Sequence, residues 1–265
     1  VFTNVCTGYT DNGNIANNER TPCRIKMTSL SGVQVTRGET GNYVYASLQV
    51  VDWSEVAQTK VGPEPKDATL SGINSMVHSI EHISGTFAGS DVNQESIKYV
   101  ELTKGQIVDN CVPFVTYRLS GSSGYPGYEL MDFRLMEPDI LRIHRDGNPA
   151  TVDYEIDIVE FEPDQVRVQQ GWFITTSGSA TATISGVNLA KAAVRAYNMS
   201  NNYTQGGQAF AGFVRTKFTN SGTLGFDRGQ TTDMVYGHYY VFEALSDQFS
   251  VQSFDTSGSV SANST

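Results

Sequence analysis

Basic residues, cysteines and long apolar runs are all scarce in this chain of 265 residues. Lysine and arginine together number 18 against 28 aspartates and glutamates, which gives a formal net charge of −10. Proteins that bind the nucleic-acid backbone use clustered lysines and arginines, and the sequence holds no such cluster. No apolar run reaches the roughly 18 residues of a membrane-spanning helix, and no signal-peptide pattern is found. We therefore expect no nucleic-acid partner and no membrane insertion.

The three cysteines, Cys6, Cys23 and Cys111, do not have the spacing of a metal centre. None belongs to a C-x-x-C pair and none has a nearby histidine partner, so a zinc site is not expected. Cys6 and Cys23 could form a disulfide that closes an Asn/Gly-rich loop. Two unpaired thiols fit the sequence nearly as well, and Cys111 is left over in either case.

Catalytic motifs are also missing from the sequence. It contains no G-x-S-x-G, H-E-x-x-H, Walker or G-x-G-x-x-G pattern. His78 and His82 would share one face of a helix, but their context indicates a strand, on which they would lie roughly 13 Å apart. The acidic, Asn-rich loop at 11–19 lacks the ligand spacing of an EF-hand. The sequence therefore predicts no metal, no cofactor and no enzymatic activity.

Strand-forming residues dominate what is present. Val, Ile, Thr, Tyr and Phe recur in short runs between clusters of Gly, Ser, Asn and Asp, as in strands joined by turns. The segment 151–158 shows the pattern clearly, since Val152, Tyr154, Ile156 and Ile158 alternate with polar residues. A period of two indicates a strand with one buried face. We predict an all-β fold.

One strand pattern occurs three times along the chain. The three stretches are VTRGETGNYVYASLQVVDW at 35–53, IHRDGNPATVDYEIDIVEF at 143–161 and FDRGQTTDMVYGHYYVFEA at 226–244. Arg37, Arg145 and Arg228 align, and another base stands eleven residues before each of them. A second block also matches, ATLSGIN at 68–74 with ATISGVN at 182–188. Matches at several fixed offsets indicate tandem copies of one antiparallel unit of about five or six strands.

The glycine-containing tripeptide at each aligned arginine indicates a hairpin turn. In the first copy it would join a strand at roughly 24–35 to one at roughly 43–53, with the arginine held by an ion pair or a carbonyl. The apolar positions then change phase after Val50, Ile158 and Val241. This change indicates a β-bulge, unless both faces are covered there. The predicted architecture is a series of tandem small antiparallel β-sandwich repeats with bulged hairpins.

The copies divide the chain into four parts. These are a partial first repeat at 1–62, a second repeat at 63–171 with an inserted hairpin near 84–125, a third repeat at 172–252, and at 253–265 the start of a further repeat or an exchanged strand. Strands are thus missing at one end and in surplus at the other. Either the chain is part of a longer array, or its last strand completes the first copy, in the same chain or in the next subunit.

Two polar loops carry aromatic residues that we identify as candidate ligand-binding positions. Tyr125 and Tyr128 lie in a Gly-rich loop, and Tyr203 and Phe210 lie in an Asn/Gln-rich one. Aromatic rings beside amide side chains suit stacking on sugars or contact with another subunit. Ordinary hairpin tips also explain them.

The stretch IDIVEFEPDQVRVQQGWFITTSGSATATISGVN at 156–188 carries a family resemblance. It resembles repeats of bacteriophage virion and tail-fibre proteins, in which a V-x-x-V-E-F-like strand ends in a V-Q-x-G turn and leads to T-A-T-I-S-x-V-N. More broadly, the unit is similar to the H-type lectin sandwich, a six-stranded unit that trimerises and binds sugars. No sugar-binding residue of that family can be matched to a position of this sequence.

The resemblance implies a non-enzymatic structural component of a virion appendage, fibre or extracellular filament. Such a protein would lie on the virion surface or outside the cell, and its partners would be copies of itself or other subunits of the virion or filament. The alternative on the same fold is a carbohydrate-binding adhesin or receptor-binding protein, with host-surface glycans as its ligands.

Overall fold

The computed structural model describes most of the chain between residues 76 and 246 and five strands outside it. The described residues are 2–10, 23–29, 32–37, 43–52, 76–87, 96–103, 108–120, 130–136, 139–145, 151–200, 212, 214–228, 231, 234–246 and 250–256. Within them every regular element is a strand except one short 3-10 helix, η2 (Val108–Asn110). No helix of the described part is long and apolar enough to cross a membrane. The predicted all-β fold is confirmed.

The strands vary from five to eleven residues in length and pair only with antiparallel neighbours. They are β1 (Phe2–Thr10), β2 (Cys23–Ser29), β3 (Gly32–Arg37), β4 (Tyr43–Asp52), β5 (Val77–Phe87), β6 (Ser96–Glu101), β7 (Cys111–Ser120), β8 (Met131–Met136), β9 (Ile140–Arg145), β10 (Thr151–Phe161), β11 (Val166–Thr175), β12 (Ser179–Thr183), β13 (Ala192–Ser200), β14 (Arg215–Asn220), β15 (Thr223–Asp227), β16 (Val235–Ala244) and β17 (Ser250–Thr256).

Three sheets share one arrangement, in which a long strand has a partner on each side. Their orders are β1-β4-β17, β5-β10-β7 and β11-β16-β13. The shorter strands form the sheets β6-β9-β8 and β12-β15-β14 and the pair β2-β3. In both β5–β10 and β11–β16, the first, sixth and third strands make the long sheet, and the second, fifth and fourth make the short one. Two segments of the chain therefore have the same topology.

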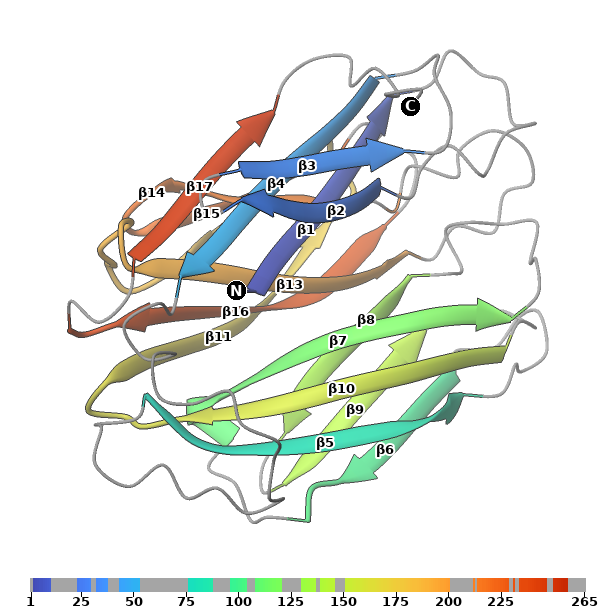
Figure 1. The fold of residues 1–265 in the computed structure, drawn as a ribbon. Helices are drawn as coiled ribbons and strands as arrows, with labels where there is room; N and C mark the ends of the chain where they lie inside the picture. The colour runs from blue at the N-terminus through green and yellow to red at the C-terminus, as the bar shows by residue number, and fades with distance from the viewer. Residues whose placement is uncertain are drawn as a thin grey trace.

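We name three modules by their strands. The second module is β5–β10, the third is β11–β16, and the first is β1–β4 together with β17. β17 pairs with β4 from Ser250 opposite Asp52 to Thr256 opposite Ala46, in the place that β5 and β11 take beside their central strands. The C-terminal strand thus lies within the same chain beside the N-terminal strands, and the third module lies between the other two (Figure 1).

Each of the second and third modules is a two-layered body with an apolar interior. In the second, Phe133 and Ile143 of the short sheet and Ile156 of the long sheet are fully buried in one cluster. In the third, the rings of Phe173 and Phe226 stack with centroids 4.0 Å apart. Burial of each such side chain stabilises the fold by about 1.5–3 kcal/mol. The alternation of apolar and polar residues along β10 is what directs Ile156 inward.

The segments on either side of the aligned arginines lie in different sheets, so the hairpin predicted there is wrong. β3 pairs with β2, whereas β4 pairs with β1 and β17; the same separation holds for β9 from β10 and for β15 from β16. A turn sequence between two alternating segments fits a crossing between facing sheets as well as it fits a hairpin. The segment expected as one strand at roughly 24–35 is itself a hairpin of β2 and β3.

Arg145 and Arg228, the aligned arginines with described side chains, are both buried. Arg228 donates from Nε to the Ser177 carbonyl at 2.8 Å, which is the kind of contact expected from the sequence. The Arg145 guanidinium instead lies over the ring of Phe87, 4.6 Å from its centre. Burial lowers the pKa of Arg145 to about 10. Both residues thus help to hold the crossing between sheets in place.

The ends of β10 and β16 are covered on both faces, which explains the change of apolar phase. Val241 and Phe242 are both buried, and the pairing of β16 runs through them without a shift. The pairing of β10 is equally continuous at Ile158 and Val159. The bulge predicted at this place is therefore wrong, and the alternative of two covered faces holds. Register shifts occur at the end of β10 against β5 and inside the β2-β3 and β14-β15 hairpins.

The strands at the predicted insert pair outside it, and strands run through two of the predicted boundaries. β6 pairs with β9, and β7 pairs with β10, so the two do not form a hairpin with each other. The predicted boundaries after residues 171 and 252 fall inside β11 and β17. The first of these boundaries follows the V-Q-Q-G stretch at 168–171, through which the strand continues, since Gly171 pairs with Tyr239.

Candidate functional site

The candidate residues chosen from the sequence lie mostly outside what the structure describes. Tyr125, Tyr128, Tyr203 and Phe210 are all outside the described residues. The side chains of Cys6 on β1 and Cys23 on β2, for which the sequence allows either a disulfide or two free thiols, are not described either. Cys111 is a buried thiol at the start of β7, and burial raises its pKa to about 12. A thiol of this kind is a poor nucleophile. The site that the described residues do form lies between the second and third modules.

The central strand of the third module's long sheet, β16, packs against an apolar cluster on each of its two faces. Along β16 the odd-numbered residues from Val235 to Val241 face the core of their own module. Tyr240 and Phe242, which alternate with them, belong to the core cluster of the second module. Phe242 stacks on Phe161 at 5.8 Å and meets Phe114 edge-on at 6.0 Å. The two modules therefore share one continuous apolar cluster.

Two phenols, of the buried Tyr240 and the partly buried Tyr197, bond the outer strands of the second module. The Tyr240 hydroxyl accepts from the Leu135 amide at 2.9 Å and donates to the Phe133 carbonyl at 3.0 Å, both on β8. The Tyr197 hydroxyl accepts from the Val115 amide at 3.2 Å and donates to the carbonyl two residues earlier on β7 at 2.7 Å. β7 and β8 are the last strands of their described sheets. The phenols thus satisfy main-chain groups that an open edge leaves unpaired.

Burial raises the pKa of both phenols, Tyr197 and Tyr240. The phenolate form is disfavoured because each ring is removed from water and its hydroxyl must donate a proton to a carbonyl. Both groups therefore remain neutral donors and acceptors across the ordinary pH range. Their role is to connect main chains, and they are unsuited to act as acids or bases.

Asp132 places a fully buried carboxylate in the same interface. Its Oδ1 accepts from the main-chain amide of His238 at 3.0 Å, and its Oδ2 lies 2.8 Å from His238 Nδ1. On the other side, Arg142 donates from Nη2 to Oδ2 at 3.1 Å. A buried carboxylate is tolerated where charged or donating partners surround it. The carboxylate of the second module thus joins Arg142 of its own sheet to His238 of the third module.

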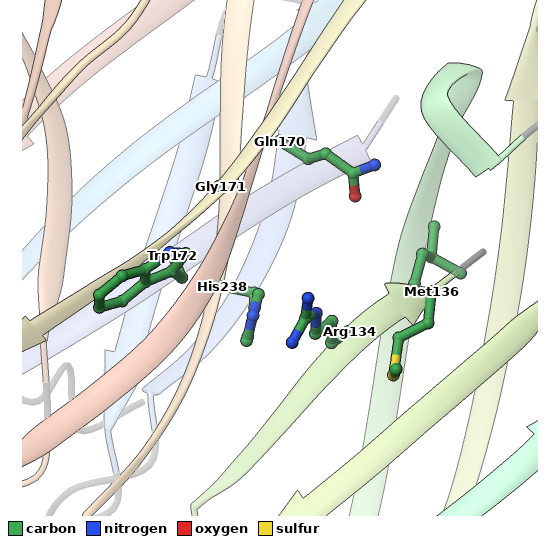
Figure 2. Close-up of a pocket in the computed structure, with 7 residues that line it drawn as sticks. Arg134, Met136, Gln170, Gly171, Trp172 and His238 are labelled. Carbon is green, nitrogen blue, oxygen red and sulfur yellow. The ribbon is translucent and has the colours of Figure 1, made fainter.

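A pocket of about 470 Å³ opens beside this carboxylate (Figure 2). It lies between β8 of the second module and strands β11 and β16 of the third, and its walls are Arg134, Leu135, Met136, Gln170, Gly171, Trp172 and His238. Trp172 is the most exposed large apolar residue of the described part, with 66% of its surface accessible. The pocket therefore combines an accessible indole with guanidinium, amide and imidazole groups.

The walls of this pocket offer groups that can bind a ligand. None of its lining residues is an aspartate or glutamate, so the pair of carboxylates used in glycoside hydrolysis is not part of its walls. Among the residues that the structure describes, no three His, Cys, Asp or Glu side chains gather closely enough to hold a metal ion. An exposed indole beside polar donors can bind a ligand that has one apolar face and several hydroxyls.

The residues of this site were not selected from the sequence, although one of them left a signal. In the run from Gln170 to Ile174, successive side chains alternate between the two faces of the strand, so Trp172 lies on the outward face and the buried Phe173 on the inward face. A tryptophan on the outward phase of a strand is worth attention, because large apolar groups are normally buried. Asp132 and Tyr240 gave no such signal, since their partners come from strands more than 100 residues away.

Comparison of the chain with protein-family models, with curated proteins and with solved structures finds no match in any of the three.

We predict that Tyr240→Phe lowers the free energy of unfolding by about 1–3 kcal/mol, because it leaves the buried Leu135 amide and Phe133 carbonyl without their shared partner. Tyr99→Phe is the matched control, since Tyr99 is 60% exposed on β6 and should change stability by less than about 0.5 kcal/mol. Urea denaturation followed by tyrosine and tryptophan fluorescence measures both. Equal stability of the two variants would contradict the assigned role of the phenol.

Proposed function

We propose that this protein is a non-enzymatic structural subunit of an extracellular or virion-surface assembly, such as an appendage, fibre or filament, and that it works through contacts between like modules. The observation that carries the proposal is a contact made twice within the chain. β13 and β16 of the third module lie against β8 of the second, and β1 and β4 of the first module lie against β14 of the third. In both cases the sixth and third strands of one module contact the fourth strand of another.

The strand orders support tandem copies of one six-stranded unit, as the sequence predicts. The same order occurs in β5–β10 and β11–β16, and β17 supplies β4 with the partner that a first strand would provide. Six strands is also the size of the H-type lectin unit that the sequence resembles. In this interpretation the N-terminal copy takes its first strand from the C-terminal end of the chain. The closure ties the two ends of the chain together by main-chain hydrogen bonds.

A contact that joins two different surfaces is well suited to building an assembly. One module presents a sheet face and the next presents its strand edges, so the contact is heterologous and can be continued from one copy to another. The face also covers edges that would otherwise invite uncontrolled pairing. A virion or filament subunit needs such a repeatable and specific contact.

The proposal predicts that purified protein at micromolar concentration forms regular oligomers, rings or filaments. Negative-stain electron microscopy and sedimentation velocity together measure their form and size. We expect species larger than one chain whose population rises with protein concentration. A chain that stays monomeric up to about 100 μM would contradict the proposal.

Carbohydrate binding is a second candidate, favoured by the accessible Trp172 in the pocket between the modules. The indole would stack on the apolar face of a sugar ring, while Arg134, Gln170 and His238 would bond its hydroxyl or acidic groups. This role is compatible with the first, because an adhesin or receptor-binding protein displays its ligand site on an assembled particle.

We predict that Trp172→Ala abolishes glycan binding or weakens it at least tenfold, which corresponds to about 1.4 kcal/mol. The control is Ile174→Ala, since Ile174 is also exposed on β11 but does not line the pocket. A glycan array followed by calorimetry with the best ligand measures both variants. Wild-type protein that binds no glycan, or equal binding by the two variants, would remove this candidate.

A further inference from the structure

The outer face of the second module's long sheet differs from that of the third module. Glu155 is exposed, and the side chains of Asp157 and His82 are 51% and 58% exposed. In the third module the corresponding positions, counted from the aligned arginines, are His238 and Tyr240, which are largely or fully covered by β8. The same face of two like modules is thus covered in the third module, whereas in the second it is open and acidic along β5 and β10 and covered at Phe114 of β7, which packs against Phe242.

Among the described strands, one sheet face and one fourth strand take no part in a contact of the kind that joins the modules. The face of the third module covers β8, and the face of the first covers β14. The second module's face, made by β5, β10 and β7, has no counterpart of this kind, and the fourth strand of the first module is β2. Among the described strands, neither β7 nor β10 makes a comparable contact with β2. One chain therefore carries both halves of a third contact of the same type.

At the equivalent positions of this face and of β2 the charges are again opposite, but the acid and the base have changed places. Between the third and second modules, His238 bonds Asp132. Alignment on the bases that precede the arginines places Arg24 of β2 where β8 has Asp132, and alignment on the arginines places Glu155 where β16 has His238. A base on the face and an acid on the strand are thus replaced by an acid on the face and a base on the strand.

A second pair of positions also brings an acid opposite a base, although the contact between the third and second modules has no ion pair there. Tyr240 bonds the main chain of β8 on either side of Arg134. The equivalent of Tyr240 in the second module is Asp157, and the equivalent of Arg134 in β2 is Lys26. Arg24 and Lys26 are two residues apart, so they share one face of the strand. The leftover face is acidic and the leftover strand is basic at the same two places.

We propose that the β5-β10-β7 face of one chain binds the β2 strand of a second copy, with Glu155 opposite Arg24 and Asp157 opposite Lys26. This inference rests on the proposed assembly function and names the surfaces that carry it. Asp157 exchanges its exposed contact with His82, 2.9 Å away, for the incoming lysine. Because the face and the strand belong to different ends of the module series, copies join head to tail and form a filament or, if the rotation closes, a ring.

Two double charge reversals test the pairing. The face variant Glu155→Arg with Asp157→Lys makes both proposed surfaces basic, and the strand variant Arg24→Glu with Lys26→Glu makes both acidic. Each variant alone should associate at least tenfold more weakly than the wild type in sedimentation velocity. An equimolar mixture should recover assembly, because the basic face of one variant meets the acidic strand of the other and the reverse contact keeps the native charges. Sodium chloride at 0.5 M should weaken the recovered assembly.

The control changes charge by the same amount elsewhere. Glu101→Arg with Asp164→Lys alters two exposed acids away from this face and should leave association unchanged. Circular dichroism and melting temperature establish that each variant is folded. If the wild type and both reversals assemble equally, the interface lies elsewhere and this inference is wrong, while the assembly function stands. If the wild type itself remains monomeric, the proposed function fails as well.

Discussion

The fold depends on how the open strand edges of one module are closed by the sheet face of the next. A sandwich of two three-stranded sheets leaves its outer strands with unpaired amides and carbonyls, and these are costly to bury and hazardous to expose. The third module resolves this with two phenols, Tyr197 and Tyr240, each of which accepts from one main-chain amide and donates to one carbonyl. The rings around them extend the apolar cluster of the second module across the boundary. The residues that close the strand edges therefore also extend the apolar core.

The same constraint accounts for the position of the pocket. The edges beneath the sheet face belong to two separate strands, β7 and β8, so the two surfaces do not match everywhere. Where they diverge, Arg134 and Met136 face Gln170, Trp172 and His238 across a gap (Figure 2). A binding site at such a boundary exists only while both modules are in place. Ligand binding and module contact would then stabilise each other, because each needs the same arrangement of β8 and β11.

The sequence predicted well what depends on local pattern. The alternation along β10 indicated a strand with an inward face, the composition indicated an all-β fold, and the recurring arginines marked equivalent places where the chain leaves one sheet for another. It predicted poorly what depends on distant partners. The turn at each arginine was interpreted as a hairpin because nothing local states that β9 and β10 pair with other strands. Phe242 suggested a bulge because its burial comes from the second module, which the sequence of β16 does not contain.

The candidate site was missed for the same reason. Asp132 and His238 are 106 residues apart, and each is an ordinary strand residue until the two modules meet. Trp172 alone could have been selected, from its outward phase. The acidic face of the second module was visible in the sequence as alternating Asp and Glu along β10, but such a pattern equally describes a solvated surface. Its meaning depends on the charges at the equivalent positions of the other modules.

Amide hydrogen exchange of Leu135 and Val115 tests the central claim most directly. Both amides belong to outer strands and donate to phenols of the third module. If module contact closes the edges, both should exchange as slowly as the core amides of β10 and β16. Exchange at the rate of an exposed edge amide, while those core amides stay protected, would contradict the account, because the two modules would then be folded but not joined.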